Sequence, residues 1–225
     1  MLMDTTSNTT DVNNTNIAYV MWFIVGLLLF LVSAVVAHSH QLTGFQARIF
    51  YDFDNLTNSF KQPALWMTEG LGSAIPIVIC VVVAALFKKY RLAWRFFVTS
   101  GGAFAVAYII KEIVKEPRPV AMLNNHLVTR AVETGPGFPS GHATVATALA
   151  LTLWLVLPTK WRWISILWIL VVGVSRLYLG VHTPVDVIGG FAIGLMAFCF
   201  VSLLPRAISR PLRLDSLDDV VISQQ

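Results

Sequence analysis

Residues 17–37 are IAYVMWFIVGLLLFLVSAVVA, an apolar run without a charged residue. A helix needs about 20 such residues to cross the hydrocarbon core of a membrane. Five further predominantly apolar runs of similar length follow, at residues 65–87, 92–114, 139–157, 161–180 and 184–204. Because backbone groups in hydrocarbon must bond internally, and these runs are continuous rather than alternating, they predict helices and not barrel strands. We therefore expect an all-α, polytopic membrane protein with six transmembrane helices.

The composition supports the same fold class. Of the 225 residues, 56% are hydrophobic and 12% are charged, whereas soluble domains carry about 25% charged residues. This excludes a cytosolic enzyme, a disordered tail and a coiled coil. Cys80 and Cys199 both lie inside apolar runs, so we interpret them as packing residues and expect neither a disulfide framework nor a zinc site. The net charge of +4 comes from cations at the ends of apolar runs, which argues against a nucleic-acid partner.

The polar segments define the predicted domain limits and topology. Residues 1–16 form a tail without Lys or Arg, so the run that follows is interpreted as a retained helix and not as a signal peptide. A six-helix domain is expected at 17–205 and a C-terminal tail at 206–225. Cations such as Lys88, Lys89 and Arg91 flank the side that both termini share, so the positive-inside rule places the termini in the cytoplasm of a cell-membrane protein. Segment 38–64 is expected to lie along the interface.

Three polar stretches far apart in sequence, 111–119, 139–142 and 175–186, emerge on the other side by the parity of the helix ends. They place three cations beside two histidines and an aspartate in a chain that otherwise avoids charge: Lys111, Arg118, Arg176, His142, His182 and Asp186. A Lys or Arg within a span costs roughly 2.5–3.5 kcal/mol on insertion scales. Charges retained near span ends are therefore functional candidates, and they are predicted on the extracytoplasmic side.

The stretch 111–119 contains two cations seven residues apart. If the helix persists, Lys111 and Arg118 share one of its faces. Pro117 and Pro119 predict that the helix ends near Arg118, which leaves its planar guanidinium available to a phosphate. The alternative is that both side chains only extend to the lipid headgroups.

Pro139, Ser140, Gly141 and His142 open the fourth apolar run. The first turn of a helix has unpaired N–H groups at the positive end of the dipole, and Gly141 allows an oxygen to approach the backbone. The stretch is predicted to be an anion site, although an ordinary Pro and Ser helix start has the same residues.

In stretch 175–186, Thr183 is predicted to be an N-cap, with Pro184 at the first helical position. Asp186 then has two interpretations. It is either the acid of a capping box, or the carboxylate that holds one nitrogen of His182 and leaves the other as a nucleophile toward phosphorus.

Together the three stretches resemble the type 2 phosphatidic acid phosphatase superfamily, whose signature is K-x6-RP, PSGH and SR-x5-H-x3-D. Every fixed position is matched: Lys111, Arg118, Pro119, Pro139, Ser140, Gly141, His142, Ser175, Arg176, His182 and Asp186. The resemblance covers roughly residues 70 to 205 and implies a membrane lipid phosphatase that needs no metal or other cofactor.

The resemblance also implies roles for these residues. His182 attacks phosphorus, Asp186 orients it, and His142 protonates the leaving oxygen and then activates water. The phosphate oxygens are bound by Lys111, Arg118, Arg176, Ser140 and Gly141. The implied partners are a lipid phosphate and membrane lipids: undecaprenyl diphosphate, phosphatidylglycerophosphate or phosphatidic acid. Protein partners are not predicted.

Other functions compatible with the pattern are a lipid phosphotransferase with the same intermediate and a non-catalytic lipid transporter or scaffold. A metallohydrolase would use His142, His182 and Asp186 as a two-histidine, one-carboxylate site. Vanadate haloperoxidases share the motif set, but six spans argue against a soluble oxidase.

A few polar residues are left without a role. His38 and His40 are interpreted as solvated, and His126 is not assigned. The sequence does not decide whether four acids pair with site cations or lie at the interface: Glu69, Glu112, Glu116 and Glu133.

Overall fold

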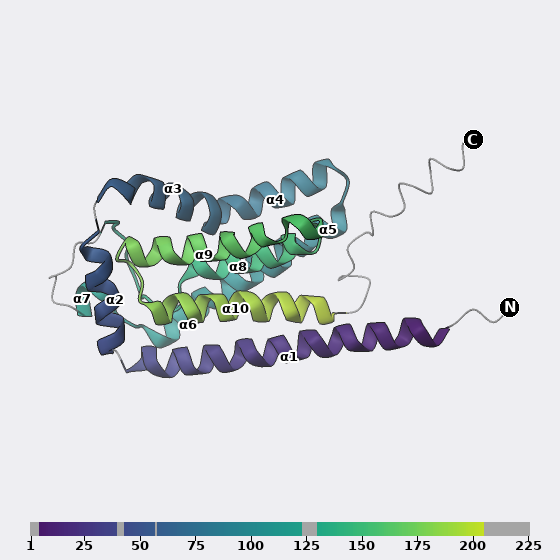
Figure 1. Cartoon of the computed structure of the whole chain (residues 1–225), viewed down its shortest axis with the longest axis horizontal. Helices are drawn as coiled ribbons and strands as arrows, with labels where there is room; N and C mark the ends of the chain where they lie inside the picture. The colour runs from purple at the N-terminus through teal and green to yellow at the C-terminus, as the bar shows by residue number, and fades with distance from the viewer. Residues whose placement is uncertain (1–4, 40–42, 57, 123–129, 205–225) are drawn as a thin grey trace.

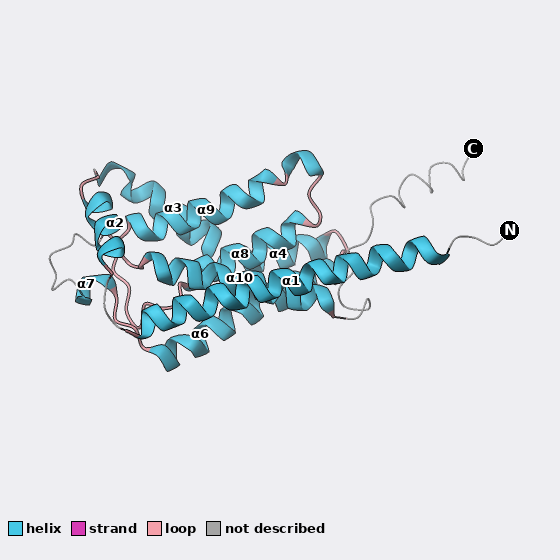
Figure 2. Cartoon of the chain, turned by 60° about the horizontal axis from the view of Figure 1, so that its bottom comes forward, coloured by secondary structure: helices cyan, strands magenta, loops and turns pink. Residues whose placement is uncertain are grey.

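The fold is a bundle of helices that run along one axis, with shorter helices at one end (Figure 1). This is a computed structural model, and it describes residues 5–39, 43–56, 58–122 and 130–204. Within these ranges every regular element is helical (Figure 2), which confirms the predicted all-α class. The helices are α1 (Thr5–His38), α2 (Gly44–Asp54), α3 (Lys61–Gly72), α4 (Ala74–Leu86), α5 (Tyr90–Phe96), α6 (Gly102–Val114), α7 (Pro119–Met122), α8 (Gly141–Trp154), α9 (Trp163–Tyr178) and α10 (Pro184–Leu203).

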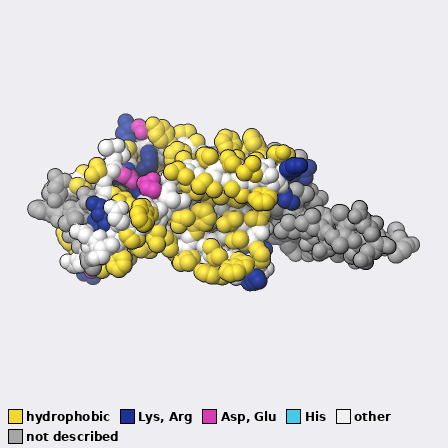
Figure 3. Space-filling view, turned by 90° about the horizontal axis from the view of Figure 1, so that it is seen from above, with side chains coloured by type: hydrophobic (Ala, Val, Ile, Leu, Met, Phe, Trp, Pro, Cys, Tyr) yellow, Lys and Arg dark blue, Asp and Glu magenta, His cyan; other side chains and the backbone are white. Residues whose placement is uncertain are grey.

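Four helical stretches in the described residues are long and apolar enough to cross a membrane: Asn14–His38, Tyr90–Met122, Thr159–Tyr178 and Pro184–Leu203. The second combines α5, the π-helical turn η2 (Phe97–Gly101), α6 and α7. The pair α3 and α4, bent by 48° at Ser73, makes a fifth if it is one span. The chain is thus a multi-pass membrane protein. Figure 3 shows hydrophobic side chains over the middle of one face and charged ones toward its two ends.

The predicted fourth span, residues 139–157, differs from the others. It forms α8, which has 14 residues and is about 21 Å long, against a hydrocarbon core of about 30 Å. The helix ends there because the chain turns at Leu155 and reaches Pro158 before the single turn η3 (Thr159–Trp161). The count of six spans therefore stays a prediction.

Two predicted boundaries are also different in the structure. Helix α1 begins at Thr5 and not at residue 17, so most of the predicted N-terminal tail is helical. Helix α6 ends at Val114, where Lys115 takes a left-handed conformation with φ of 51°. The early end follows from Pro117, which lacks an N–H and disfavours helical geometry in the residue before it. Lys111 and Arg118 therefore do not share the face of one continuous helix.

Helix α8 forms the centre of the bundle, and every residue from 143 to 150 is buried. Its threonine hydroxyls donate to carbonyls one turn earlier, from Thr144 to Ser140 at 2.9 Å and from Thr147 to Ala143 at 2.8 Å. These bonds satisfy the buried hydroxyl groups inside the helix itself. These buried threonines of α8 thus need no partner on neighbouring helices.

Close contact between α8 and α10 depends on glycine. A Cβ on Gly190 would lie 2.5 Å from the Ser140 carbonyl oxygen, and one on Gly194 would lie 2.7 Å from the Thr144 carbonyl oxygen. Small residues four apart allow two helix backbones to approach in this way. Because Ser140 begins α8, Gly190 also sets the distance between the two helix starts that carry the motifs.

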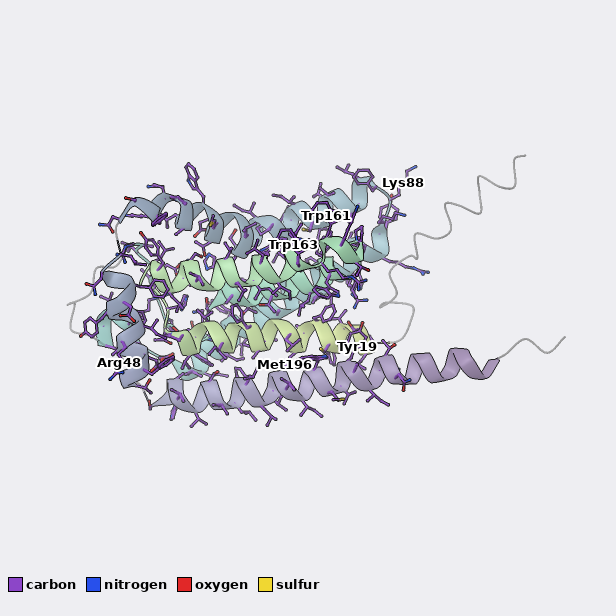
Figure 4. The ribbon with its side chains drawn as sticks, in the orientation of Figure 1. Tyr19, Arg48, Lys88, Trp161, Trp163 and Met196 are labelled. Carbon is purple, nitrogen blue, oxygen red and sulfur yellow. The ribbon has the colours of Figure 1, made fainter. Side chains whose placement is uncertain are left out.

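Helix α1 packs along α10 on the outside of the bundle. Figure 4 places Tyr19 and Met196 in this contact, and the Tyr19 ring meets Phe198 edge-on at 5.9 Å. Lys88, Trp161 and Trp163 lie at the end away from α2, whereas Arg48 lies on α2 (Figure 4). Helix α2, within the segment expected at the interface, begins with a Thr43 and Gln46 capping box and lies across the end of the bundle (Figures 1 and 2).

Replacing Gly190 by Ala should destabilise the protein, because the added Cβ meets a main-chain oxygen that cannot rotate away. The expected loss is about 1–3 kcal/mol, the usual cost of overpacking. Gly102→Ala is the matched control, since a Cβ there meets nothing within 4 Å. Thermal unfolding in detergent should show a lower midpoint for Gly190→Ala alone, and equal midpoints for the two variants would contradict the close helix contact.

Candidate active site

Direct hydrogen bonds hold the three motif stretches together at one end of the bundle. The Ser140 N–H donates to the Asp186 carbonyl oxygen at 2.9 Å and joins the start of α8 to the start of α10. Arg118 Nη1 donates to the Val181 carbonyl oxygen at 2.8 Å and joins the segment after α6 to the same turn. Residues far apart in sequence therefore form one site, at the end of the bundle that carries α2.

The pair His182 and Asp186 lies at the centre of this site. Asp186 Oδ2 lies 3.1 Å from His182 Nδ1 and accepts the Thr183 N–H at 2.8 Å. Thr183 Oγ1 in turn accepts the Asp186 N–H at 3.0 Å, which completes the capping box. The two interpretations of Asp186 are therefore compatible, because one carboxylate both caps α10 and orients the imidazole.

The environment of His182 favours a neutral imidazole. The side chain is 1% exposed. Burial lowers the pKa of His182 well below its ordinary value, while the hydrogen bond to Asp186 acts in the opposite direction and the nearby Arg176 and Lys111 lower it further. If Nδ1 carries the proton donated to Asp186, Nε2 carries a lone pair. Such a nitrogen is a nucleophile.

Two arginines near His182 bind one carboxylate. Arg118 Nη2 lies 3.0 Å from Glu133 Oε2, and Arg176 Nη2 bonds Glu133 Oε1. Glu133 Oε2 also lies 3.8 Å from His182 Nε2. The two guanidinium groups and the nucleophilic nitrogen thus converge on a single anionic group, which makes this point an anion site.

The remaining donors of the site cations fix their positions. Arg118 Nε donates to the Gly135 carbonyl oxygen at 3.0 Å, and Arg176 Nη1 donates to Thr68 Oγ1 at 3.2 Å. Lys111 Nζ donates to the carbonyl oxygens of Pro136 and Gly137 at 2.8 and 3.0 Å. Lys111 and Arg118 are thereby held against the segment that precedes α8, and Arg176 is held against α3.

His142 lies in the first turn of α8, as predicted, and faces α3. Its Nε2 lies 3.4 Å from Glu69 Oε1. Ser140 is the N-cap of α8, with Oγ 3.5 Å from the Ala143 nitrogen, and it is fully buried. Because its own N–H is already donated to Asp186, this amide does not point toward the anion site. Gly141 follows it as the first residue of the helix.

A cavity of about 380 Å³ opens beside the anion site. Its wall includes Arg176 and Glu133 from the site, together with Lys61, Gln62 and Glu69 on α3. A second cavity of about 390 Å³ is lined by apolar residues such as Phe60, Met67 and Val174. The two cavities lie on opposite faces of α3, so a polar and an apolar space are adjacent there.

The sequence did not single out Glu133 or Thr68. Glu133 was one of four unassigned acids, and nothing in its local sequence distinguishes it from Glu69, Glu112 or Glu116. Of these, Glu116 is buried near Asp186, while Glu112 is exposed on α6. Only the path of the chain brings Glu133 to the arginines.

Other assignments involve residues away from this site. Cys80 is half-buried and Cys199 is buried, both without a disulfide. His38 lies in the last turn of α1, whereas His40 and His126 fall outside the described residues. Among the residues that are described, no three His, Cys, Asp or Glu side chains are close enough to hold a metal ion, so the metallohydrolase alternative finds no support there.

Sequence comparisons relate the chain to known proteins. Residues 92–210 match the family model of the PAP2 superfamily. The chain is 28% identical over 203 residues to phosphatidylglycerophosphatase B of Bacillus subtilis, which covers 81% of this chain and 94% of that protein. It is 33% identical over 121 residues to an undecaprenyl-diphosphatase of Sulfolobus acidocaldarius, over 52% of this chain and 58% of that relative. The second match thus spans less than two thirds of that relative.

Two crystal structures have a similar fold. One is the first transmembrane PAP2 type phosphatidylglycerolphosphate phosphatase from Bacillus subtilis, with a TM-score of 0.68 and 24% identity over 85% of this chain and 98% of that chain. The other is Aquifex aeolicus LpxE, with a TM-score of 0.64 and 22% identity over 72% of this chain and 96% of that chain. At these identities the likeness concerns the fold.

Replacing His182 by Asn should make stability less sensitive to acid. Because burial lowers the pKa of His182, the unfolded chain binds a proton at a higher pH than the folded chain, so this group reduces stability as pH falls below its ordinary pKa. Asn does not titrate, but its amide still donates to Asp186. From about pH 7.5 to about pH 5.5, the unfolding midpoint of the variant should fall less than that of the wild type.

The control for this measurement is His38→Asn, at an exposed position at the end of α1. It should follow the wild type across the same pH range. An acid sensitivity of His182→Asn equal to that of the wild type would mean that the folded state accommodates a charged His182.

Proposed function

The chain belongs to the PAP2 superfamily of phosphatases, which confirms the family resemblance of its three motifs, and we propose that it hydrolyses the terminal phosphate of a membrane lipid. One observation carries this proposal: Arg118 and Arg176 bind the Glu133 carboxylate, and one of its oxygens lies 3.8 Å from the Nε2 of the oriented His182. Phosphoryl transfer depends mainly on positioning and charge stabilisation, and this geometry supplies both.

In the proposed first step, His182 Nε2 attacks phosphorus in line and forms a P–N bond while the bond to the leaving oxygen breaks. The leaving oxygen takes a proton from His142. Asp186 holds the Nδ1 proton and stabilises the positive charge that develops on the imidazole. The product of this step is a phosphohistidine together with the dephosphorylated lipid.

In the second step, His142 accepts a proton from water as the water oxygen attacks phosphorus. The P–N bond breaks and orthophosphate forms, which restores both histidines. Glu69, 3.4 Å from His142 Nε2, supports the proton-carrying form of this imidazole, which is needed before the first step and is restored after the second. No metal ion or other cofactor takes part in this scheme.

The phosphate oxygens are bound by Lys111, Arg118 and Arg176, with the α8 start at Ser140 and Gly141 adding the positive end of a helix dipole. Glu133 must leave this position when phosphate binds, because both anions need the same arginine groups. The Ser140 N–H is not included among the phosphate donors, since it donates to the Asp186 carbonyl oxygen.

The paired cavities support an amphiphilic substrate. The polar cavity beside Arg176 accommodates a headgroup, and the apolar one on the opposite face of α3 accommodates part of a hydrocarbon chain. The preferred candidates are undecaprenyl diphosphate and phosphatidylglycerophosphate, as the names of the relatives suggest, followed by phosphatidic acid. We place the site on the extracytoplasmic side of the cell membrane, the termini in the cytoplasm and the catalytic domain at residues 17–205.

His182→Asn should abolish phosphate release from every lipid phosphate that the wild type accepts. The expected loss is at least about 10³-fold, because the variant lacks the attacking nitrogen. Release of inorganic phosphate is measured with a panel of prenyl diphosphates and phospholipid phosphates, and His38→Asn should keep the wild-type rate. Normal release by the folded His182 variant would overturn the mechanism.

Labelled substrate tests the intermediate and separates hydrolase from transferase. With ³²P-lipid, the quenched wild type should carry acid-labile, alkali-stable label, and His182→Asn should carry none. Label that ends in orthophosphate identifies a hydrolase, and label that ends in a second lipid identifies a phosphotransferase. A requirement for a metal after chelation would instead favour the metallohydrolase alternative.

Arg118→Lys should lower activity although the charge is kept. The guanidinium bonds the backbone through Nε and Nη1 while Nη2 faces the anion, and an ammonium group cannot reproduce this arrangement. Loss of one charged hydrogen bond costs about 1.5–3 kcal/mol, so we expect turnover to fall at least about tenfold. Arg48→Lys on the exposed surface of α2 is the control, and equal turnover of the two variants would contradict the geometric role.

A further inference from the structure

We propose that Glu133 is an internal competitor for the phosphate site: its carboxylate binds the two phosphate-binding arginines, and every substrate or product phosphate must displace it. This inference rests on the proposed function, because it takes the anion site to be the phosphate site. The residue was not predicted from the motifs and it belongs to none of them.

The contacts of Glu133 match those expected of a bound phosphate. One oxygen bonds Arg176, and the other lies 3.0 Å from Arg118 and 3.8 Å from His182 Nε2. Two oxygens on two guanidinium groups are the arrangement that arginine makes with carboxylate and phosphate alike. A phosphorus atom in line with His182 therefore cannot bind while the carboxylate is in this position.

The backbone around Glu133 is fixed on both sides. On one side, the Arg130 N–H donates to the Leu179 carbonyl oxygen at 3.0 Å, and its guanidinium lies 4.6 Å from the Tyr178 ring. On the other side, the Gly137 N–H donates to the Glu116 carbonyl oxygen at 2.7 Å. Displacement is therefore a rotation of the side chain, and the tethered carboxylate can return as soon as the phosphate leaves.

The structure also provides a place for the displaced carboxylate. Glu133 is 23% exposed and lines the cavity of about 380 Å³. Lys61 lies on the wall of the same cavity and offers a cation to the rotated side chain. The two positions of Glu133 thus correspond to a closed and an open phosphate site.

A tethered competitor has a defined effect on affinity. It lowers the affinity of the site for every phosphate ligand by the same factor, because each ligand must first displace the carboxylate. Binding of the product phosphate is therefore weakened as much as binding of the substrate. Product release becomes faster, and KM becomes higher. The alternative is a purely structural role, in which Glu133 only neutralises two cations that would otherwise be buried without a partner.

Glu133→Gln distinguishes the two roles, because the amide keeps the shape of the side chain but not its charge. Binding of orthophosphate to the purified full chain is measured by calorimetry in detergent, together with KM and kcat for a lipid phosphate. We expect the orthophosphate Kd and the KM to fall by the same factor, about tenfold, a ratio that corresponds to about 1.4 kcal/mol. Glu112→Gln on the exposed face of α6 should change neither constant.

If the folded Glu133→Gln variant binds orthophosphate with an unchanged or higher Kd, the proposal is overturned and Glu133 is only a structural partner of the arginines. If this variant does not fold, Glu133→Asp replaces it, because Asp keeps the charge but has a shorter side chain. The Asp variant should bind orthophosphate several-fold more tightly than the wild type. Unchanged binding would again overturn the proposal.

The two proposals fail in different ways. A wild type that binds orthophosphate but releases none from any lipid would refute the proposed function, while the Kd comparison would still decide whether Glu133 competes for the anion site. If the wild type is active and Glu133→Gln binds orthophosphate with the same Kd as the wild type, only the proposal that Glu133 competes with phosphate is refuted.

Discussion

Two donors share the carboxylate of Asp186, and the rest of the site depends on this arrangement. The Thr183 N–H bonds it and starts α10, while the His182 imidazole bonds the same oxygen. The main-chain oxygen of Asp186 accepts the N–H of Ser140 and so places the start of α8. One residue therefore positions two helices and the nucleophile, and the orientation of His182 follows from the same bonds that form the fold.

Around this residue the bundle is built to bring charge together in an apolar chain. The glycines of α10 let α8 approach until the two helix starts touch, and the threonines of α8 satisfy their own hydroxyl groups. The charged groups of the three motifs are gathered at one end of the bundle. At that end Glu133 pairs with both arginines and Lys111 bonds main-chain oxygens, so these contacts offset part of the cost of removing the charged groups from water.

Much of this arrangement was predictable, because charges are rare in such a sequence and their spacing has few interpretations. Spacing and helix-start signals identify four residues that the structure places around one anion site: His182, Asp186, Arg118 and Arg176. Glu133 was not predictable, since the pairing of a carboxylate depends on how a loop folds back. The early end of α6, the short α8 and the bond made by the Ser140 amide also depend on packing that spacing does not reveal.

The hydrogen bonds from Lys111 and Arg118 to main-chain oxygens have a thermodynamic consequence. Long cationic side chains lose up to about 2 kcal/mol of rotamer entropy when they are immobilised. Here that loss is incurred during folding, because the carbonyl oxygens of Gly135, Pro136 and Gly137 already fix both side chains. An anion that binds there thus meets cationic side chains that are already fixed, and its binding costs little further side-chain entropy.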